Sequence, residues 1–415
     1  MASRRFERCQ RMIVLNDKKD CCGCWSCANI CPKHCIEMVE DDEGFRYPKI
    51  DQTLCVDCGL CEKACPVINT DTQDIPFEQQ GWLVQHKDEQ IRHESTSGGA
   101  FTAIAAYVIG KGGVVFGAGY RKGSFIVVHQ SAESVEGLSV YRNSKYVQSE
   151  IGDCYAQALK YLKAGRLVLF SGTPCQIEGL RFFLRGKDYD NLILQDLVCR
   201  AVPSPAILRS YISAQEQLIG GNFLKILFRD KYHGYHYSSF SIYNKDKDKD
   251  YHKGIDSNEY LRSFFDNMND RPSCYDCRFK KRYRKSDITL WDCFPIEKFT
   301  NKLDGKGTTR VLVHTKKGAE IINAAMKDLN AVSVNPDSLT DGVREMFKSV
   351  PYNPKRQQFF DDFKKMGSVA FFKKWFPITL KVRLNSFVRL TCHRLGIYAL
   401  AKRVFLKFYT RKDER

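Results

Sequence analysis

The sequence predicts a multidomain α+β and α/β protein, in which a small cysteine-rich module precedes an α/β domain and a basic helical tail. Three observations support this division. One cysteine pattern occurs twice within residues 17–70, apolar strands alternate with amphipathic helices through residues 80–330, and residues 335–415 have a helical, basic pattern. At 415 residues the chain exceeds a single typical core, so several domains are expected.

The module at residues 17–70 contains the run Cys-x2-Cys-x2-Cys-x3-Cys-Pro twice, at Cys21–Pro32 and at Cys55–Pro66. This is the spacing of bacterial ferredoxins, in which three thiolates of a run bind one 4Fe-4S cluster and the fourth binds the other cluster. The pattern therefore predicts a ferredoxin-like dicluster module with two 4Fe-4S clusters. The predicted ligands are Cys21, Cys24, Cys27 and Cys65 for one cluster and Cys55, Cys58, Cys61 and Cys31 for the other.

Disulfides or paired zinc sites are the alternative explanation for so many cysteines. Zinc sites usually pair two CxxC motifs across a long gap and lack a third cysteine two residues on. Eighteen cysteines in cluster-type spacings within a large chain indicate a reducing compartment. The N-terminus has no signal-peptide stretch, and no window reaches the roughly 18 apolar residues of a membrane helix. We therefore expect a cytoplasmic protein, attached at most to the inner face of the membrane.

The net charge of +17 is unevenly distributed along the chain. Residues 17–70 carry six basic and ten acidic side chains, whereas residues 351–415 carry sixteen basic and four acidic ones. The positive charge is thus mostly a property of the tail, and the acidic module argues against nucleic acid as a partner.

The remaining pattern gives the expected elements in order. Residues 36–51 alternate apolar and polar side chains around Glu43-Gly44, which predicts a hairpin, and residues 67–80 read as a linker. The expected strands cover 81–84, 114–120, 167–170 and 191–199, and the expected helices cover 100–109, 154–165 and 176–184. Their alternation predicts a largely parallel sheet. The stretch 244–253, rich in lysine and aspartate, is expected to be a solvated loop.

A second, dispersed group of cysteines consists of Cys175, Cys199, Cys274 and Cys277. Cys175 and Cys199 each follow a predicted buried strand, where functional residues of α/β sheets gather. Cys274 and Cys277 form a CxxC turn, and the run Arg278–Lys285 beside it would favour thiolates. The four could hold a third 4Fe-4S cluster, but free cysteines are also common as small buried residues.

The segment Ser97-Gly98-Gly99 places small residues before the helix at 100–109. Free backbone N–H groups and the helix dipole at such a position suit a phosphate or pyrophosphate. Arg142, Ser144 and Lys145 are further candidates for contact with a phosphate or a flavin ring. Simple helix capping and a solvated lysine are the alternatives.

Taken together, these motifs resemble the coenzyme F(420) hydrogenase/dehydrogenase beta-subunit family over residues 80–300. The matching segments are Ser97–Gly99, Ser144–Val147, Gly172–Gln176, Leu197–Cys199, Pro203–Pro205, Cys274–Cys277 and Ser286–Thr289. The resemblance implies an FAD-dependent iron–sulfur oxidoreductase with Ser97, Gly98 and Gly99 in the flavin site. It also implies a third 4Fe-4S cluster on the dispersed cysteines. Some bacterial members are encoded near surface-polysaccharide genes, which implies a small-molecule or glycan-linked substrate.

The sequence therefore predicts an enzyme that passes electrons from a ferredoxin or other redox protein through clusters to FAD and an organic substrate. Because clusters exchange single electrons, a flavin would be needed to collect two of them. The alternative is a non-catalytic electron-carrier subunit of a larger oxidoreductase complex. Residues 371–409 mix aromatic and basic side chains, a pattern that fits either a peripheral contact with an anionic membrane or a helical cap on the α/β domain.

Overall fold

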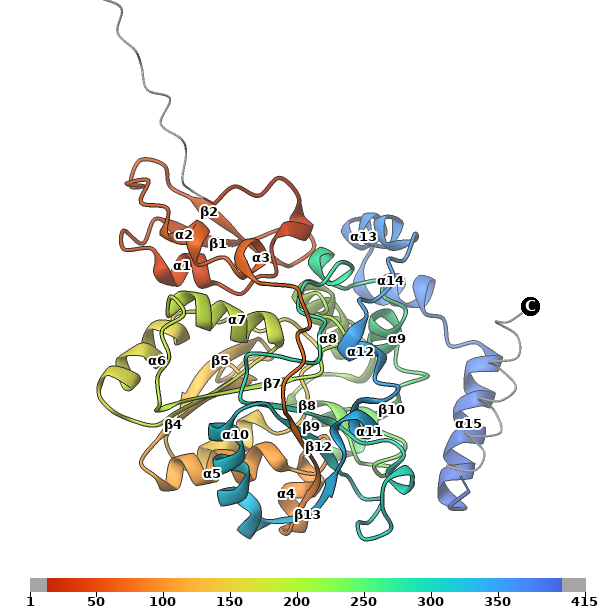
Figure 1. The fold of residues 1–415 in the computed structure, drawn as a ribbon. Helices are drawn as coiled ribbons and strands as arrows, with labels where there is room; N and C mark the ends of the chain where they lie inside the picture. The colour runs from red at the N-terminus through yellow and green to blue at the C-terminus, as the bar shows by residue number, and fades with distance from the viewer. Residues whose placement is uncertain (1–12, 398–415) are drawn as a thin grey trace, which may run out of the picture.

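The computed structural model describes residues 13–397 of the chain. Residues 13–79 form the cysteine-rich module and the segment that leads out of it. The module contains the antiparallel pair β1 (Ile36–Glu40) and β2 (Arg46–Ile50) and the short helices α1 (Ser26–Ile30), α2 (Leu60–Lys63) and α3 (Pro66–Asn69). Figure 1 shows the module seated on the helical surface of the following domain, next to α7 (Pro174–Phe183). The predicted hairpin is thus present.

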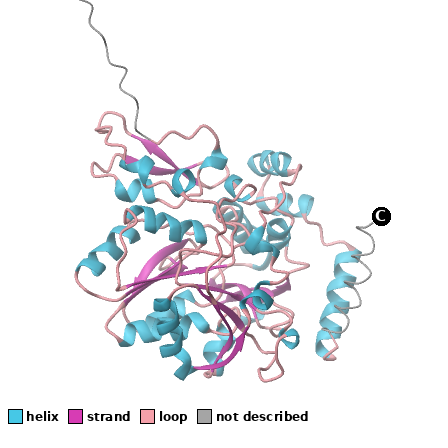
Figure 2. Cartoon of the chain, viewed as in Figure 1, coloured by secondary structure: helices cyan, strands magenta, loops and turns pink. Residues whose placement is uncertain are grey.

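The middle of the chain forms one eight-stranded sheet (Figure 2). In spatial order its strands are β13 (Leu329–Val334), β3 (Gln80–His86), β12 (Thr309–Val313), β11 (Ile288–Asp292), β7 (Leu192–Leu197), β6 (Val168–Ser171), β4 (Val114–Tyr120) and β5 (Val127–Ala132).

Helices cover both faces of this sheet because successive strand residues point to opposite sides. Phe116, Phe170 and their neighbours two residues away pack with α6 (Cys154–Lys163) and α7. The intervening residues, such as Leu169, pack with α5 (Ala100–Gly110) and α10 (Lys316–Ala325). The domain therefore has three layers.

The prediction of a largely parallel sheet is correct for the centre and wrong for the flanks. Strands β11, β7, β6 and β4 run parallel, whereas β5, β12, β3 and β13 are antiparallel to their neighbours. Residues 121–126 between β4 and β5 are too few for a crossover helix, so this pair must be antiparallel. The parallel strands all end at one edge, which is called the carboxyl edge below.

A second core, which the sequence did not predict, is built on three antiparallel strands. These are β8 (Phe223–Asp230), β9 (Ser239–Asn244) and β10 (Tyr251–Gly254). Aromatic side chains dominate its packing with α8 (Pro205–Ile219), α9 (Glu259–Phe265), α13 (Arg356–Lys365) and α14 (Ser368–Trp375). The expected solvated loop at 244–253 is wrong for its last residues, because Tyr251–Gly254 pairs with β9.

Helices also follow β13, in agreement with the helical pattern predicted from residue 335. They are α11 (Pro336–Thr340), α12 (Arg344–Phe347), α13, α14 and α15 (Leu380–Arg394), while α4 (Glu89–Glu94) lies earlier, after β3. Phe371, Phe372 and Phe376 are buried in the second core, whereas α15 has no buried residue. Residues 398–409 of the aromatic and basic stretch lie outside the described residues. Within residues 13–397, no helix combines the length and apolarity needed to cross a membrane.

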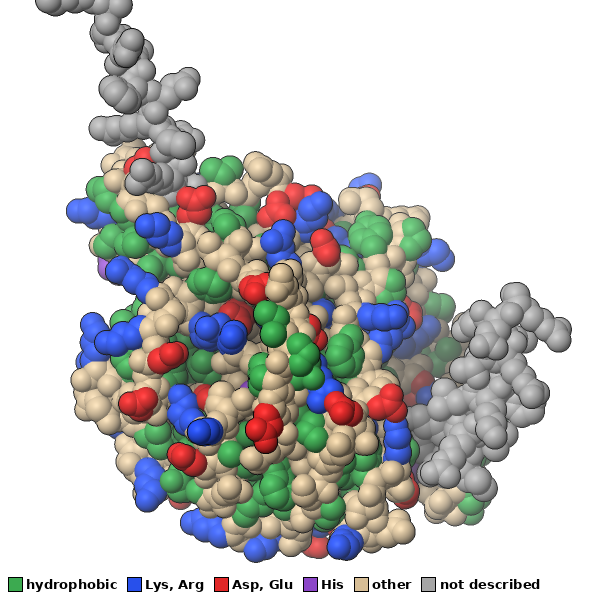
Figure 3. Space-filling view, in the orientation of Figure 1, with side chains coloured by type: hydrophobic (Ala, Val, Ile, Leu, Met, Phe, Trp, Pro, Cys, Tyr) green, Lys and Arg blue, Asp and Glu red, His purple; other side chains and the backbone are tan. Residues whose placement is uncertain are grey.

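The basic run Arg278–Lys285 turns inward and holds the segment that leaves the module. Arg278 donates to the backbone oxygen of Val67 at 2.9 Å, and Lys281 donates to that of Asp71 at 2.9 Å. Arg278 and Lys281 therefore attach this segment to the α/β domain. Acidic and basic side chains are interspersed on the face shown in Figure 3.

The tip of the module's hairpin packs against helices α8 and α13, which border the second core. Gly44 has a φ of +87°, and a Cβ there would lie 2.5 Å from the backbone nitrogen of Ala206 in α8. Glu43 pairs through both carboxylate oxygens with Arg356 of α13, at 2.8 and 2.5 Å. Both side chains are buried, so this ion pair fixes the module to the C-terminal helices.

Replacement of Arg356 by Met should destabilise the protein by about 3–5 kcal/mol, because it leaves the Glu43 carboxylate buried without a cation. The matched control is Lys364→Met on the same helix, which removes an exposed pair with Asp42 and should cost no more than about 1 kcal/mol. Denaturant unfolding of the full chain measures both variants. Equal losses of stability would contradict the role assigned to the buried pair.

Candidate iron–sulfur and cofactor sites

The two cysteine runs of the module line two separate pockets. Cys21, Cys24 and Cys27 of the first run line one pocket together with Cys65 of the second run. Apolar side chains such as Ile13 complete its wall. The structure thus brings together the four cysteines that the ferredoxin spacing groups, and their role as iron ligands remains a prediction.

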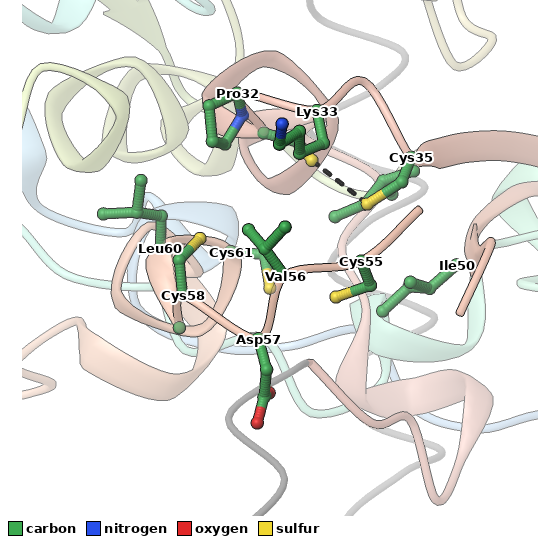
Figure 4. Close-up of a pocket in the computed structure, with 13 residues that line it drawn as sticks. Pro32, Lys33, Cys35, Ile50, Cys55, Val56, Asp57, Cys58, Leu60 and Cys61 are labelled. Carbon is green, nitrogen blue, oxygen red and sulfur yellow. Dashed lines mark hydrogen bonds between the residues drawn. The ribbon is translucent and has the colours of Figure 1, made fainter. Parts of the chain in front are cut away.

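The second pocket contains the other predicted set, Cys55, Cys58, Cys61 and Cys31. Figure 4 shows the side chains of Cys55, Cys58 and Cys61 directed toward the same space. Cys58 is exposed and Val56 beside it is 56% exposed, whereas three of the four cysteines of the first pocket are buried. The second pocket therefore holds the more exposed of the two cysteine sets.

Both loops use the same backbone conformation on either side of the second cysteine of each run. The flanking residues are Gly23 and Trp25 in one loop, with φ of 68° and 66°, and Asp57 and Gly59 in the other, with φ of 52° and 70°. Left-handed backbone costs a non-glycine residue roughly 1–2 kcal/mol. The same left-handed conformation occurs in both loops. This indicates that the need to direct the cysteine side chains into the pocket, and not local propensity, determines it.

The gathered thiols fit a multiply charged metal centre. Burial and the nearby sulfurs of Cys21, Cys65 and Cys61 hold the pKa of Cys27 well above its usual range. Such thiols become thiolates together only beside a strong positive charge. Among residues 13–397, no three His, Cys, Asp or Glu side chains are placed to hold one metal ion. A cubane takes one thiolate on each of four irons and so requires wider spacing.

Each pocket also contains a thiol outside the predicted ligand sets. Cys22 lines the first pocket and belongs to the buried cluster against which Cys175 packs. Cys35 lines the second pocket, with its sulfur 3.3 Å from that of Cys31. No spacing rule marks either residue, although each lies within or directly beside a cysteine run.

The four dispersed cysteines also lie close together. Cys175 begins α7 after β6, and Cys199 follows β7, so both lie at the carboxyl edge. Burial raises the pKa of Cys199 to about 12. The charge of Lys280 opposes this rise, and the nearby Cys175 and Cys277 add to it. Burial, Cys277 and Cys199 likewise raise the pKa of Cys274. Four thiols gathered in this way fit a third 4Fe-4S cluster, because buried thiols become thiolates together only beside a strong positive charge.

The glycine segment before α5 lies at the same edge of the sheet. Gly98 donates its N–H to the Thr309 hydroxyl at 2.9 Å, and the Ser97 hydroxyl lies 2.9 Å from the same oxygen. Gly99 has a φ of +85° as the N-cap of α5. A Cβ at Gly98 would lie 2.3 Å from the backbone oxygen of Val84. Close packing against β3 and β12 thus accounts for one of the two glycines.

Lys145 belongs to a neighbouring segment that is joined to the glycine loop. The Thr96 hydroxyl accepts a hydrogen bond from the backbone N–H of Ser144 at 2.7 Å. Lys145 itself donates to the backbone oxygens of Val140 and Arg142 at 2.8 and 3.0 Å. Burial, together with the nearby Lys225, lowers the pKa of Lys145 to about 7. The structure therefore brings the four predicted flavin contacts into one region.

Three further polar residues at this edge were missed because their partners are remote in sequence. Buried Lys231 donates to the backbone oxygen of Ser97 at 2.8 Å, which holds the glycine loop from the second core. Arg229 contacts the Tyr146 hydroxyl at 2.9 Å and Asp292, at the end of β11, at 3.2 Å. The edge is thus lined by two cations, Arg229 near the end of β8 and Lys231 directly after that strand.

Comparisons with known proteins agree with this architecture. Residues 165–337 match the family model that describes the C terminus of the beta subunit of coenzyme F(420) hydrogenase/dehydrogenase, and residues 20–69 match the 4Fe-4S dicluster domain. Residues 165–337 thus form a domain of the coenzyme F(420) hydrogenase/dehydrogenase beta-subunit family. The resemblance inferred from the motifs is confirmed, and a 4Fe-4S dicluster domain precedes this domain in the chain.

Similar proteins match different parts of the chain. NADH-quinone oxidoreductase subunit I 2 of Geobacter metallireducens is 37% identical over 70 residues, which are 16% of this chain and 53% of that protein. Ferredoxin 7Fe of Hydrogenibacillus schlegelii is 36% identical over 64 residues, 15% of this chain and 76% of that protein. Coenzyme F(420)-dependent sulfite reductase of Methanocaldococcus jannaschii is 29% identical over 173 residues, 40% of this chain and 25% of that protein. The chain thus spans about half the length of the Geobacter protein and a quarter of the length of the sulfite reductase.

Gly179 of α7 packs directly against the loop that carries Cys24 of the first pocket. A Cβ at Gly179 would lie 2.9 Å from the Cys24 Cβ and 2.9 Å from the Tyr155 hydroxyl. Gly179→Ala should therefore displace the Cys24 loop, reduce the iron bound per chain, and cost about 1–3 kcal/mol of stability. Gly110→Ala in α5, where nothing lies within 4 Å, is the matched control and should leave iron content unchanged. Full iron content in both variants would contradict this packing argument.

Proposed function

We propose that this chain is an FAD-dependent iron–sulfur oxidoreductase, which takes electrons from a ferredoxin or similar redox protein and delivers them to an organic substrate. The supporting observation is that the module and the α/β domain meet at their cysteines, because Cys175 and Cys277 of the dispersed set pack against the buried cysteines of the module. Bound clusters would supply one-electron steps and FAD a two-electron step. Contact between the cysteine sets is the arrangement that electron transfer requires.

In this proposal the chain's own residues hold and separate the cofactors. Residues 17–70 would bind two 4Fe-4S clusters through the two crossed cysteine sets, and residues 80–330 would bind the third cluster through the dispersed set. Ser97, Gly98, Gly99 and Lys145 would contact FAD, and residues 335–415 would be the basic helical C-terminal region. Burial of the first pocket would exclude water, whereas the exposed Cys58 would mark the entry side.

A non-catalytic electron carrier is the second candidate, and a specific observation favours it. The Ser97 hydroxyl, the Gly98 N–H and the Lys145 ammonium group all have partners within the chain. These groups would have to exchange partners to contact a flavin. Bound flavin and turnover with an acceptor would support the enzyme, whereas clusters without flavin would support the carrier.

Anaerobic purification should yield about twelve iron atoms per chain, since each of three cubanes contains four irons. Cys58→Ala and Cys274→Ala should each lower the content to about eight, and the enzyme hypothesis adds one FAD per chain. Iron, sulfide and flavin quantitation measures these values. A wild-type content near eight that Cys274→Ala does not change would refute the third cluster.

We also propose that the redox partner docks where the second pocket opens, at Val56 and Cys58. Val56→Asp should slow reduction by a ferredoxin roughly tenfold, as expected for loss of about 1.4 kcal/mol from an interface contact. The control is Leu224→Asp on β8, since Leu224 is 66% exposed and remote from the pocket. Stopped-flow reduction kinetics measure the rates. Equal rates for both variants and the wild type would place the partner elsewhere.

A peripheral membrane contact through α15, serving a glycan-linked substrate, is a further part of the proposal. Leu380, Leu384 and Phe387 on this helix are 83%, 64% and 67% exposed, with Lys381 and Arg383 between them. Leu384→Asp/Phe387→Asp should abolish co-sedimentation with anionic vesicles, because it removes the apolar face and adds negative charge. Leu218→Asp, at a 54% exposed position on α8, is the control. Undiminished sedimentation of the double variant would refute a contact through α15.

A further inference from the structure

One buried arginine lies between the first pocket and the turn that carries Cys274. Arg271 is fully buried and directly precedes the turn at Pro272–Cys274. Its Nε donates to the backbone oxygen of Cys21 at 2.7 Å, and one terminal nitrogen lies 3.4 Å from the Cys21 sulfur. The same nitrogen donates to the backbone oxygen of Arg46 at 3.0 Å. The guanidinium group therefore touches a predicted ligand of the first cluster directly.

No carboxylate pairs with this cation among residues 13–397. The other terminal nitrogen donates to the Gln148 amide oxygen at 2.8 Å, and the group stacks on the Tyr47 ring at 4.3 Å. The charges that act on Arg271 come from Cys21, Tyr47, Cys22 and Cys274. The positive charge thus faces sulfurs of the first pocket and of the dispersed set.

Gly23 leaves the space that the contact between Arg271 and the Cys21 loop requires. Gly23 has a φ of +68°, and a Cβ there would lie 2.4 Å from the Gln148 amide nitrogen and 2.8 Å from a terminal nitrogen of Arg271. In the second loop the equivalent residue is Asp57, which carries a side chain. The two pockets share a backbone conformation but differ in the charge beside them.

Such an arrangement has a defined electrochemical effect. Hydrogen bonds to ligand sulfurs, net charge and solvent exposure together determine the reduction potential of a cluster. Uptake of one electron makes a site more negative, and a buried cation at hydrogen-bond distance stabilises that state strongly, since the local dielectric is low. A cation beside one site only would raise the potential of that site relative to the other.

We propose that Arg271 raises the reduction potential of the cluster site formed by Cys21, Cys24, Cys27 and Cys65. An electron that enters at the exposed site of Cys58 is thereby drawn inward, toward the turn that carries Cys274. The inference rests on the proposed function, because it requires a cluster in the first pocket. Arg271 acts through Cys21 and is a positioning residue for electron transfer.

The test is an anaerobic redox titration of the full chain, followed by electron paramagnetic resonance. Arg271→Gln should make the first site at least tenfold harder to reduce, a shift of about 59 mV for one electron, and leave the Cys58 site unchanged. Signals are assigned with Cys58→Ala, which removes the second site. Arg271→Lys keeps the charge and should shift the potential less.

Two variants keep the test decisive if Arg271→Gln does not fold. Gln148→Glu keeps the acceptor for Arg271 and offsets the guanidinium charge, so it should also lower the potential of the first site; it loses the donation of the amide nitrogen to the backbone oxygens of Cys22 and Gly23. Tyr47→Phe keeps the charge and the sulfur contact and should leave the potential unchanged. An unaltered first-site potential in iron-replete Gln148→Glu protein overturns the role of Arg271. Absence of iron from the wild-type first pocket would overturn the proposed function itself.

Discussion

The arrangement of the domains depends on one dipeptide, Asp270-Arg271. The Arg271 side chain binds the Cys21 loop and the end of the hairpin at Arg46, while the backbone oxygen of Asp270 accepts from Arg356 at 3.0 Å. Arg356 in turn pairs with Glu43 at the hairpin tip. The module is thereby attached at two points to one short segment, which continues into the turn of Cys274. Any rotation of the module would break buried hydrogen bonds of charged groups, so the cysteine sets are held in contact.

The sheet places the remaining groups relative to this junction. Strands β6, β7 and β11 are parallel and end together, so Cys175 and Cys199, which follow β6 and β7, lie at the same edge as Asp292, the last residue of β11. The second core then supplies two cations to the same edge, Arg229 in β8 and Lys231 directly after that strand. One side of the edge receives the module and the other receives the glycine loop, an order that suits electron flow from a protein surface to a cofactor site.

The cysteine pockets could be predicted from the sequence because their ligands are local and their spacing is specific. Strands and helices at 114–197 were likewise visible, since short apolar strands alternate with amphipathic helices there. The junction could not be predicted, because Arg271 lies 250 residues from Cys21 and Arg356 lies 313 residues from Glu43. The antiparallel strands at the flanks of the sheet and the aromatic second core could not be predicted for the same reason. Their pairing depends on tertiary contacts, and β10 begins within a stretch of lysines and aspartates.

The central claim is that three cysteine sets, joined at Asp270-Arg271, each hold a cluster. Anomalous X-ray diffraction at the iron absorption edge, from anaerobically grown crystals, tests it most directly. The account predicts three separate iron centres, bounded by Cys21, Cys24, Cys27 and Cys65, by Cys31, Cys55, Cys58 and Cys61, and by Cys175, Cys199, Cys274 and Cys277. Iron confined to the first two sets, or single-ion peaks in place of clusters, would contradict it.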